Sequence, residues 1–95
     1  MIKQSDDRLL LQGPVTIVTV TALLTQLRAQ LAPGIAVLDF EGVTEVDSAA
    51  VALALECLRE ARRRQLSVSL ANLPESMRNL AELYSVSELL QAGSA

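Results

Sequence analysis

The chain has 95 residues, which is the size of one small domain and too few for two separate hydrophobic cores. Its composition is 51% hydrophobic and 20% charged, and its core must be built from Leu, Val, Ile and Ala because only Phe40 and Tyr84 are aromatic. The net charge of -3 and the lack of an aromatic stacking platform argue against nucleic acid as a partner.

The first third of the chain predicts two strands and a helix. Residues 8–12, "RLLLQ", predict a strand, paired through the Asp6-Asp7 turn with a short edge segment at 2–4. Hydrophobic residues then recur at three- and four-residue steps and predict a helix with Thr16 as its N-cap. The residues expected on the buried face of this helix are Ile17, Val20, Leu24, Leu27 and Leu31.

Strands and helices continue to alternate in the rest of the chain. The apolar run at 35–40 predicts a strand in the centre of the sheet, and a helix is expected at 49–64. Apolar residues alternate with serines at 66–70, as in a strand, and Pro74 suits the first turn of a last helix. That helix would share one face among Met77, Leu80, Ala81 and Tyr84. The expected fold is therefore a single α/β domain over residues 1–95, with a small, mostly parallel sheet and helices.

The residues give little support for catalysis. Histidine is absent, which removes the commonest general base and metal ligand at neutral pH. Cys57 is the only cysteine, so there is no internal disulfide and no zinc spacing. Ser48 lacks the flanking glycines of a nucleophile elbow, and no Gly-rich loop could cradle a nucleotide. We therefore expect a non-enzymatic protein without cofactor or metal. No segment resembles a signal peptide or a membrane span, so we also expect the protein to be cytoplasmic and not inserted directly in a membrane.

Acidic residues gather between the central strand and the following helix. Asp39, Glu41, Glu45 and Asp47 could hold magnesium, as in a phosphoacceptor receiver domain, with acyl phosphate forming on Asp39 or Asp47. That site also needs a nearby lysine, and Lys3 belongs to the expected edge segment far from a suitable strand end. Solvated acids in the loop between strand and helix are the simpler interpretation.

Ser48 stands where the helix at 49–64 should begin. Serine is a preferred N-cap, because its hydroxyl accepts a hydrogen bond from an unpaired amide of the first turn. A phosphate on Ser48 would lie at the positive end of the helix and beside Asp47 and Glu45, so the position also suits a switch.

The helix after Ser48 is expected to show an apolar outer side near its start. Its core side should hold Val51, Ala54, Leu55, Leu58 and Ala61, and its polar side Glu56, Arg59, Glu60 and Arg63. Toward the N-terminus the outer side continues with Ala49, Ala52 and Leu53, which would be exposed beside Ser48. An apolar patch rimmed by charge predicts a docking surface.

The motifs "AVLDFEGV", "TEVDSAAVALALECLREARRRQLSVSLANL" and "LAELY" together resemble the STAS domain, whose members include the anti-sigma factor antagonists. The usual loop of that family is Asp-Ser-Ser/Thr-Gly, and this chain has Asp47-Ser48-Ala49-Ala50. It keeps the serine that is phosphorylated in the antagonists and lacks the second hydroxyl and the glycine.

Within the family, the short length and the ending "LAELYSVSELL" are most similar to the small STAS subunit of the Mla phospholipid ABC transporter of Gram-negative bacteria. The resemblance implies a subunit that binds the cytoplasmic ATPase, in a complex with the permease and the periplasmic lipid-binding subunit. Such a subunit supports the phospholipid transport that maintains outer-membrane lipid asymmetry, and it lies at the inner membrane through its partner. The partner-binding residues would be Asp47, Ser48, Ala49, Ala52, Leu53 and Glu56.

The alternative function is that of an anti-sigma factor antagonist, which switches partners when Ser48 is phosphorylated. Ser48 is then the phosphoacceptor, whereas in the transporter subunit it is only part of a docking surface.

Overall fold

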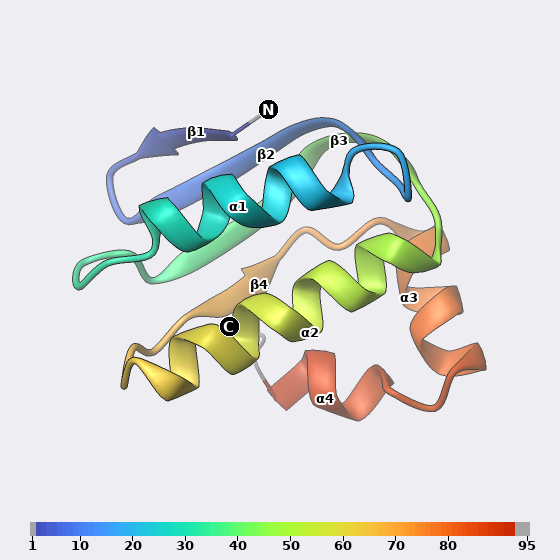
Figure 1. The fold of residues 1–95 in the computed structure, drawn as a ribbon. Coiled ribbons are helices and arrows are strands. Elements are labelled where there is room, and N and C mark those ends of the chain that lie inside the picture. The colour runs from blue at the N-terminus through green and yellow to red at the C-terminus, as the bar shows by residue number, and fades with distance from the viewer. Residues whose placement is uncertain (1, 93–95) are drawn as a thin grey trace.

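Strands and helices alternate along residues 2–92, the part of the chain that the computed structural model describes (Figure 1). The elements are β1 (Ile2–Ser5), β2 (Arg8–Val15), α1 (Val20–Gln30), β3 (Val37–Val46), α2 (Ser48–Arg63), β4 (Ser69–Ala71), α3 (Glu75–Leu83) and α4 (Ser87–Ala92). The strand order is β1-β2-β3-β4, with β1 antiparallel to β2 and the other two pairs parallel. This confirms the predicted α/β fold with a mostly parallel sheet.

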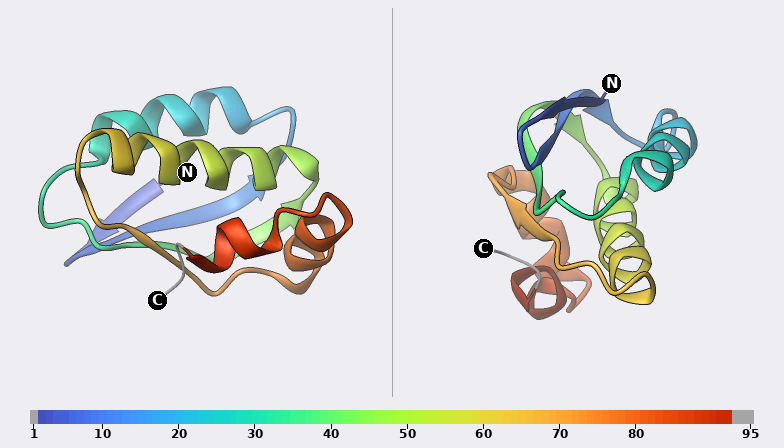
Figure 2. Two further views of the ribbon diagram at one scale, coloured as in Figure 1. Left: turned by 90° about the horizontal axis from the view of Figure 1, so that it is seen from below. Right: turned by 90° about the vertical axis from the view of Figure 1, so that its left-hand side faces the viewer.

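The hydrophobic core lies between the sheet and the helices α1 and α2, which cover the same face of the sheet (Figure 2). Leu9 and Leu11 of β2 and Leu38 and Phe40 of β3 are buried there. Since β3 pairs with β2 on one side and β4 on the other, the predicted central position of this strand is confirmed. Leu70 fixes β4 to the same core, although β4 is shorter than the predicted strand.

The helix α1 begins later than the sequence pattern predicts. The pattern makes Thr16 the N-cap and Ile17 a buried residue, whereas α1 begins at Val20 and the side chain of Ile17 is 74% exposed. The residues before α1 form a turn because threonine hydroxyls there bond to neighbouring backbone groups, in competition with the helix. The buried residues of α1 are Leu23 and Leu27, so the predicted face is correct only in its later part.

The helix α2 confirms the predicted span but not the predicted outer side. Leu53 is only 1% exposed and Ala49 is also buried, so neither belongs to an exposed apolar patch. The cause is α1. Glu56 and Glu60 lie on the same side of α2 as Leu53, three and seven residues further along. Glu56 pairs with Arg28 of α1. Glu60 is bonded to Arg64, which in turn donates to the backbone at the end of α1. A helix flanked by α1 on one side and by α3 and α4 on the other buries more than one narrow face.

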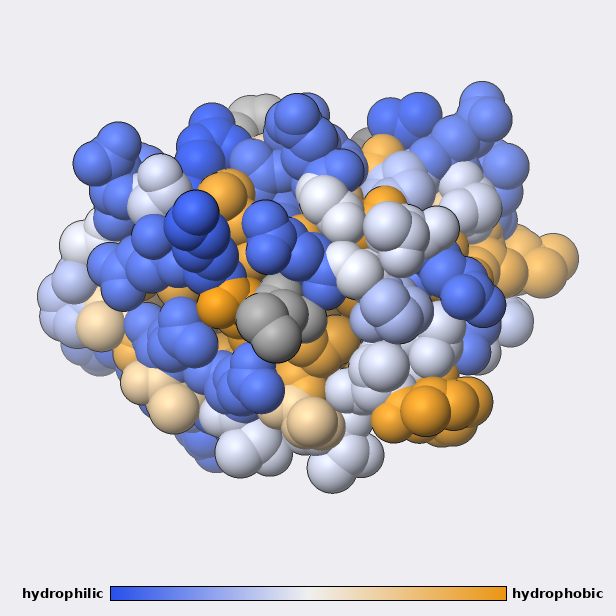
Figure 3. Space-filling view, turned by 90° about the horizontal axis from the view of Figure 1, so that it is seen from above, coloured by the Kyte–Doolittle hydropathy of each residue, from blue (hydrophilic) through white to orange (hydrophobic). Residues whose placement is uncertain are grey.

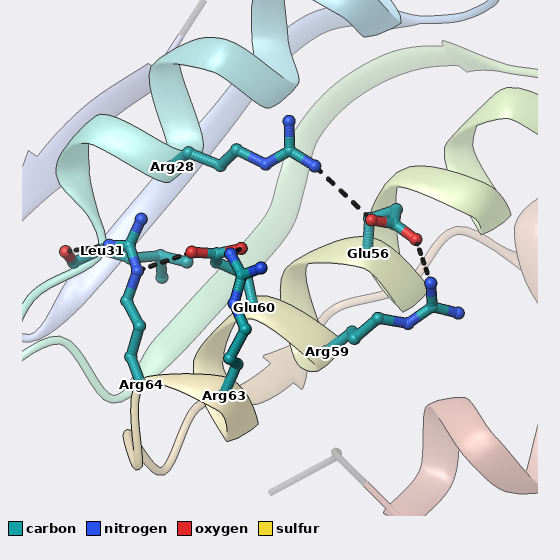
Figure 4. Close-up of polar contacts among 7 residues, drawn as sticks. All are labelled: Arg28, Leu31, Glu56, Arg59, Glu60, Arg63 and Arg64. Atoms are coloured by element: carbon teal, nitrogen blue, oxygen red, sulfur yellow. Dashed lines mark hydrogen bonds and ion pairs between the residues drawn. The ribbon is translucent and has the colours of Figure 1, made fainter.

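Hydrogen bonds and ion pairs hold the C-terminal half of α2 against α1 (Figure 4). Glu60 is buried, although the sequence pattern places it on the polar side, and it accepts hydrogen bonds from Arg63 and Arg64. Arg64 Nη1 also donates to the backbone carbonyl of Leu31, at 3.1 Å. The bond from Arg63 is the main reason that the pKa of Glu60 lies below its ordinary value, despite the opposing effect of burial. Glu60 therefore remains charged and joins the two helices.

The C-terminal part contains one helix more than the sequence pattern predicts. Pro74 is the N-cap residue of α3, and Met77 and Ala81 are buried as expected. Tyr84 follows α3 and is about half exposed, because the chain turns at Ser85, which has a φ of 59°, and begins α4. The short length of α4 explains why its periodicity is not recognisable in the sequence.

We predict that Leu53→Ala destabilises the fold by about 2–5 kcal/mol, because it removes a buried side chain and leaves a cavity between α2 and α1. Urea denaturation measures the free energy of unfolding. Ala52→Ser, on the exposed neighbouring position, serves as control and should change that free energy by no more than about 0.5 kcal/mol. Equal effects of the two substitutions would show that Leu53 is not in the core.

Candidate functional site

Two loops meet at the carboxyl ends of β2 and β3. These strands are parallel and stay paired up to Val15 and Val46, despite two register shifts, so the turn at 16–19 lies beside the start of α2 (Figure 1). In open α/β sheets, ligands bind outside the carboxyl ends of the strands. Asp47 and Ser48, both predicted as site residues, lie at this end.

The Asp47 side chain joins the two loops. Its Oδ1 accepts a hydrogen bond from the amide of Ala49 at 2.8 Å, which makes Asp47 the N-cap of α2. Its Oδ2 accepts a second bond from the amide of Ile17 at 3.0 Å. The prediction that Ser48 is the N-cap is therefore wrong: Asp47 has that role, and Ser48 is the first residue of the helix, with its side chain exposed.

The turn between β2 and α1 presents hydrophobic side chains to solvent. Thr19 Oγ1 accepts a hydrogen bond from the amide of Thr16 and donates one to the carbonyl of Pro14, at 3.0 and 2.9 Å. These bonds fix the turn, and the bond to Asp47 fixes it against α2, so that Ile17 and Val18 point outward with 74% and 88% exposure. Figure 3 shows hydrophobic surface standing out at this end of the molecule, at the lower right.

Sequence reasoning missed Ile17 and Val18, because the helical spacing suggested that Ile17 is buried. The run Thr16-Ile17-Val18-Thr19 after Gly13-Pro14 contains the signal that could have identified the turn. β-Branched residues have a lowered helix propensity, and threonine hydroxyls bond to nearby backbone groups in turns and caps in preference to a helix interior.

Ala52 and Glu56 continue the row of residues that begins at Ser48, since positions four apart lie above one another on a helix. Ala52 is exposed. Glu56 is half-buried and pairs with Arg28 of α1 at 3.5 Å and with Arg59 at 2.9 Å. We use the term end surface for Ile17, Val18, Asp47, Ser48 and Ala52, with Glu56 at its border. The predicted site members Ala49 and Leu53 are buried, on the side of α2 that also holds Glu56 and faces α1.

The acidic residues are not the solvated loop that the sequence suggests, since β3 continues to Val46 and contains Asp39, Glu41 and Glu45. Glu41 and Glu45 are exposed, whereas Asp39 is buried. No group of three or more His, Cys, Asp or Glu side chains suited to a metal ion occurs within residues 2–92. The acids of β3 therefore do not converge on a site.

Asp39 belongs to a hydrogen-bonded network that joins three segments. Its Oδ2 pairs with Arg8 of β2 at 2.8 Å, and its Oδ1 accepts bonds from Asn72 at 3.0 Å and from the amide of Glu41 at 2.9 Å. Burial tends to raise the pKa of Asp39, but the bonds from Asn72, Glu41 and Arg8 outweigh it and leave the pKa below its ordinary value. Asp39 is a structural anion.

Burial also raises the pKa of the Cys57 thiol to about 12. The thiol is therefore protonated at neutral pH and is a poor nucleophile and metal ligand.

The fold is similar to that of a solved structure, and the sequence matches a family model. A solved structure described as the anti-sigma factor antagonist SpoIIAA in its unphosphorylated form matches 87% of this chain and 81% of that chain, with a TM-score of 0.62 and 19% sequence identity. The family model described as "Mlab, STAS domain" matches residues 2–91. The chain therefore belongs to the MlaB-type STAS domain family, which confirms the resemblance found in its motifs.

Other comparisons add less. A structure described as a crystal structure analysis of Mglu matches 79% of this chain and 19% of that chain, with a TM-score of 0.56 and 26% identity. No curated protein sequence matches the chain significantly. Within residues 2–92, no helix has both the length and the hydropathy needed to cross a membrane.

We predict that Asp47→Ala lowers the free energy of unfolding by about 1 kcal/mol, because α2 loses its N-cap bond. It should also speed hydrogen exchange at the Ile17 amide, which loses its acceptor. Asp47→Asn is the matched variant: its one remaining carbonyl oxygen can accept only one of the two bonds, so its stability should be intermediate. Unchanged exchange at Ile17 in Asp47→Ala would contradict the described geometry.

We predict that acid weakens the fold partly through Asp39. The folded protein holds the pKa of Asp39 below the ordinary value of 3.8, so its stabilising contribution is complete above that pH and is lost as the pH falls through the lower folded value. Asp39→Asn should therefore lose less stability than the unmodified protein between pH 7 and acidic pH, measured by urea denaturation. The control is Glu41→Gln, at a nearby exposed residue, which should lose as much stability in acid as the unmodified protein. If Asp39→Asn also loses as much, Asp39 does not contribute to the acid sensitivity of the fold.

Proposed function

We propose that this protein is a non-enzymatic subunit of an Mla phospholipid ABC transporter and binds the transporter's cytoplasmic ATPase through the end surface. The match to the MlaB-type STAS family over residues 2–91 supports the class of complex. The observation that carries the choice of surface is the hydrogen bond from Ile17 to Asp47, which holds two exposed hydrophobic side chains beside Ser48.

The end surface has the composition of an interface centre with a polar border. Ile17 and Val18 are the most exposed of the large hydrophobic residues that the structure describes, and burying each such side chain in a partner contributes about 1.5–3 kcal/mol. The Ser48 hydroxyl can exchange hydrogen bonds with the partner and give the contact direction. Because the turn is already fixed through Asp47, binding loses little conformational entropy.

The mechanism is differential binding. A module that contacts one arrangement of the ATPase better than another favours that arrangement, without a catalytic group of its own. In this way the protein promotes assembly and activity of the complex with the permease and the periplasmic lipid-binding subunit, and so phospholipid transport that maintains outer-membrane lipid asymmetry. The ATPase holds the protein at the cytoplasmic side of the inner membrane.

A second candidate function is that of an anti-sigma factor antagonist regulated by phosphorylation of Ser48. It is favoured by the exposed side chain of Ser48 at the start of a 16-residue helix, where the helix dipole stabilises a phosphate. The adjacent charge of Asp47 opposes it. Incubation with an anti-sigma kinase, followed by intact mass measurement, separates the two functions, since only the antagonist should gain a phosphate.

We predict that Val18→Glu and Ser48→Lys each weaken binding to the cognate ATPase subunit by at least about tenfold, because each places a charge in the centre of the interface. Binding is measured by titration calorimetry with the purified ATPase subunit. Both residues are exposed, so both variants should fold like the unmodified protein, which thermal denaturation verifies.

The matched control is Leu83→Glu, which introduces the same charge as Val18→Glu at a residue that is 73% exposed on α3. It should bind the ATPase with unchanged affinity. If Val18→Glu and Ser48→Lys bind as well as Leu83→Glu, the end surface is not the ATPase-binding surface.

A further inference from the structure

A second surface lies at the other end of α2. A groove of about 910 Å³ runs between the C-terminal half of α2, the segment leading to β4, and α4. Its hydrophobic lining comes from Leu55 and Leu58 of α2, Leu66 and Val68 of the segment before β4, and Leu89 of α4. The first four are half-buried and Leu89 is 58% exposed, so the groove offers solvent-accessible hydrophobic surface.

The charge along this groove is opposite to that of the protein. The chain has 11 acidic and 8 basic residues, yet the described residues that line the groove include Arg59 and Arg62 and no acid. Arg59 pairs with Glu56, whereas Arg62 is exposed and has no ion pair among the described residues. The guanidinium group of Arg62 is therefore available to an incoming carboxylate.

We propose that this groove binds an acidic amphipathic helix of a partner protein. Leu55 and Leu58 are three residues apart on one face of α2, a spacing that complements hydrophobic anchors on a second helix packed against it. Carboxylates beside those anchors would meet Arg59 and Arg62 at the edge of the groove.

The shape of the groove favours a helix over a small amphiphile. Small-molecule sites enclose most of their ligand, whereas this groove is open to solvent along one side and would leave an acyl chain largely hydrated. A helix needs only one apolar stripe to be covered and keeps its other face in water.

The groove and the end surface meet at their borders, where Glu56 pairs with Arg59, but their far ends are well separated. Arg62 is 14 residues beyond Ser48 on α2, which at 1.5 Å per residue places these two residues about 21 Å apart along the helix axis, so partners centred on them can bind together. The domain then acts as an adaptor that connects two protein segments.

The test uses a set of fluorescein-labelled helical peptides with leucines at positions i, i+3, i+4 and i+7 and glutamates beside them, in several registers. Binding to the full chain is measured by fluorescence anisotropy. We expect at least one peptide to bind, with affinity falling steeply between low and high salt. Lysine-for-glutamate versions of the same peptides should bind far more weakly.

Two pairs of matched variants locate the site. Arg62→Glu should weaken binding about fivefold, while Arg78→Glu, which reverses an exposed arginine on α3, should not. Leu89→Ser should weaken binding about tenfold, while Leu83→Ser, at the exposed end of α3, should not. The second pair keeps the test decisive if charge reversal near the end of α2 affects folding.

Three outcomes would overturn the proposal: no peptide of the set binds at millimolar concentration, the variants of each pair bind alike, or the lysine peptides bind equally well. Binding to phosphatidylglycerol vesicles that depends on Arg62, without peptide binding, would also overturn it in favour of a lipid surface. Concentration-dependent self-association that Leu89→Ser abolishes would identify a second copy of the chain as the occupant and equally contradict it. The proposed function is tested separately, by the affinity of Ser48→Lys for the ATPase subunit. Failure of the peptide test therefore does not count against the proposed function.

Discussion

The carboxylate of Asp47 fixes the geometry on which the end surface depends. One oxygen caps α2 and the other holds the amide of Ile17, so a single side chain sets where α2 begins and where the turn before α1 lies. Neither loop contributes much buried surface of its own. Without this bridge, only the Thr19 bonds and the pairing of β2 with β3 would hold Ile17 and Val18 near Ser48, and the end surface would be less preorganised.

The position of α2 in the fold separates its two ends. Near its start, Ala49 and Leu53 are buried on the side of α2 that faces α1, so only Ser48 and Ala52 remain exposed and the hydrophobic part of the surface comes from a different loop. Near its end, Glu60 and Arg64 join α2 to α1 on one side, and the groove opens on the other. One helix thus connects two surfaces of different charge.

Much of the architecture is predictable from the sequence because strands and helices differ in hydrophobic period. The central strand, α2 and the Asp6-Asp7 hairpin follow directly from such patterns. Helix starts are less predictable. The start of α1 is displaced by two hydrogen bonds that the sequence pattern does not reveal. The Thr19 bond depends on a side-chain rotamer, and the Asp47 bond joins two loops that are 30 residues apart in the chain. The burial of Leu53 depends on where α1 lies, which the periodicity of α2 alone does not specify. For the same reason the exposed hydrophobic residues were predicted on α2, whereas the structure exposes Ile17 and Val18 on the turn before α1.

The central claim is that the partner binds where the turn at 16–19 meets the start of α2. Hydrogen exchange with and without the ATPase subunit tests this most directly. We predict slower exchange on binding for the amides of residues 16–19 and 48–52, with little change for α3. Protection confined to β1 or α3, with unchanged exchange at 16–19 and 48–52, would contradict the account.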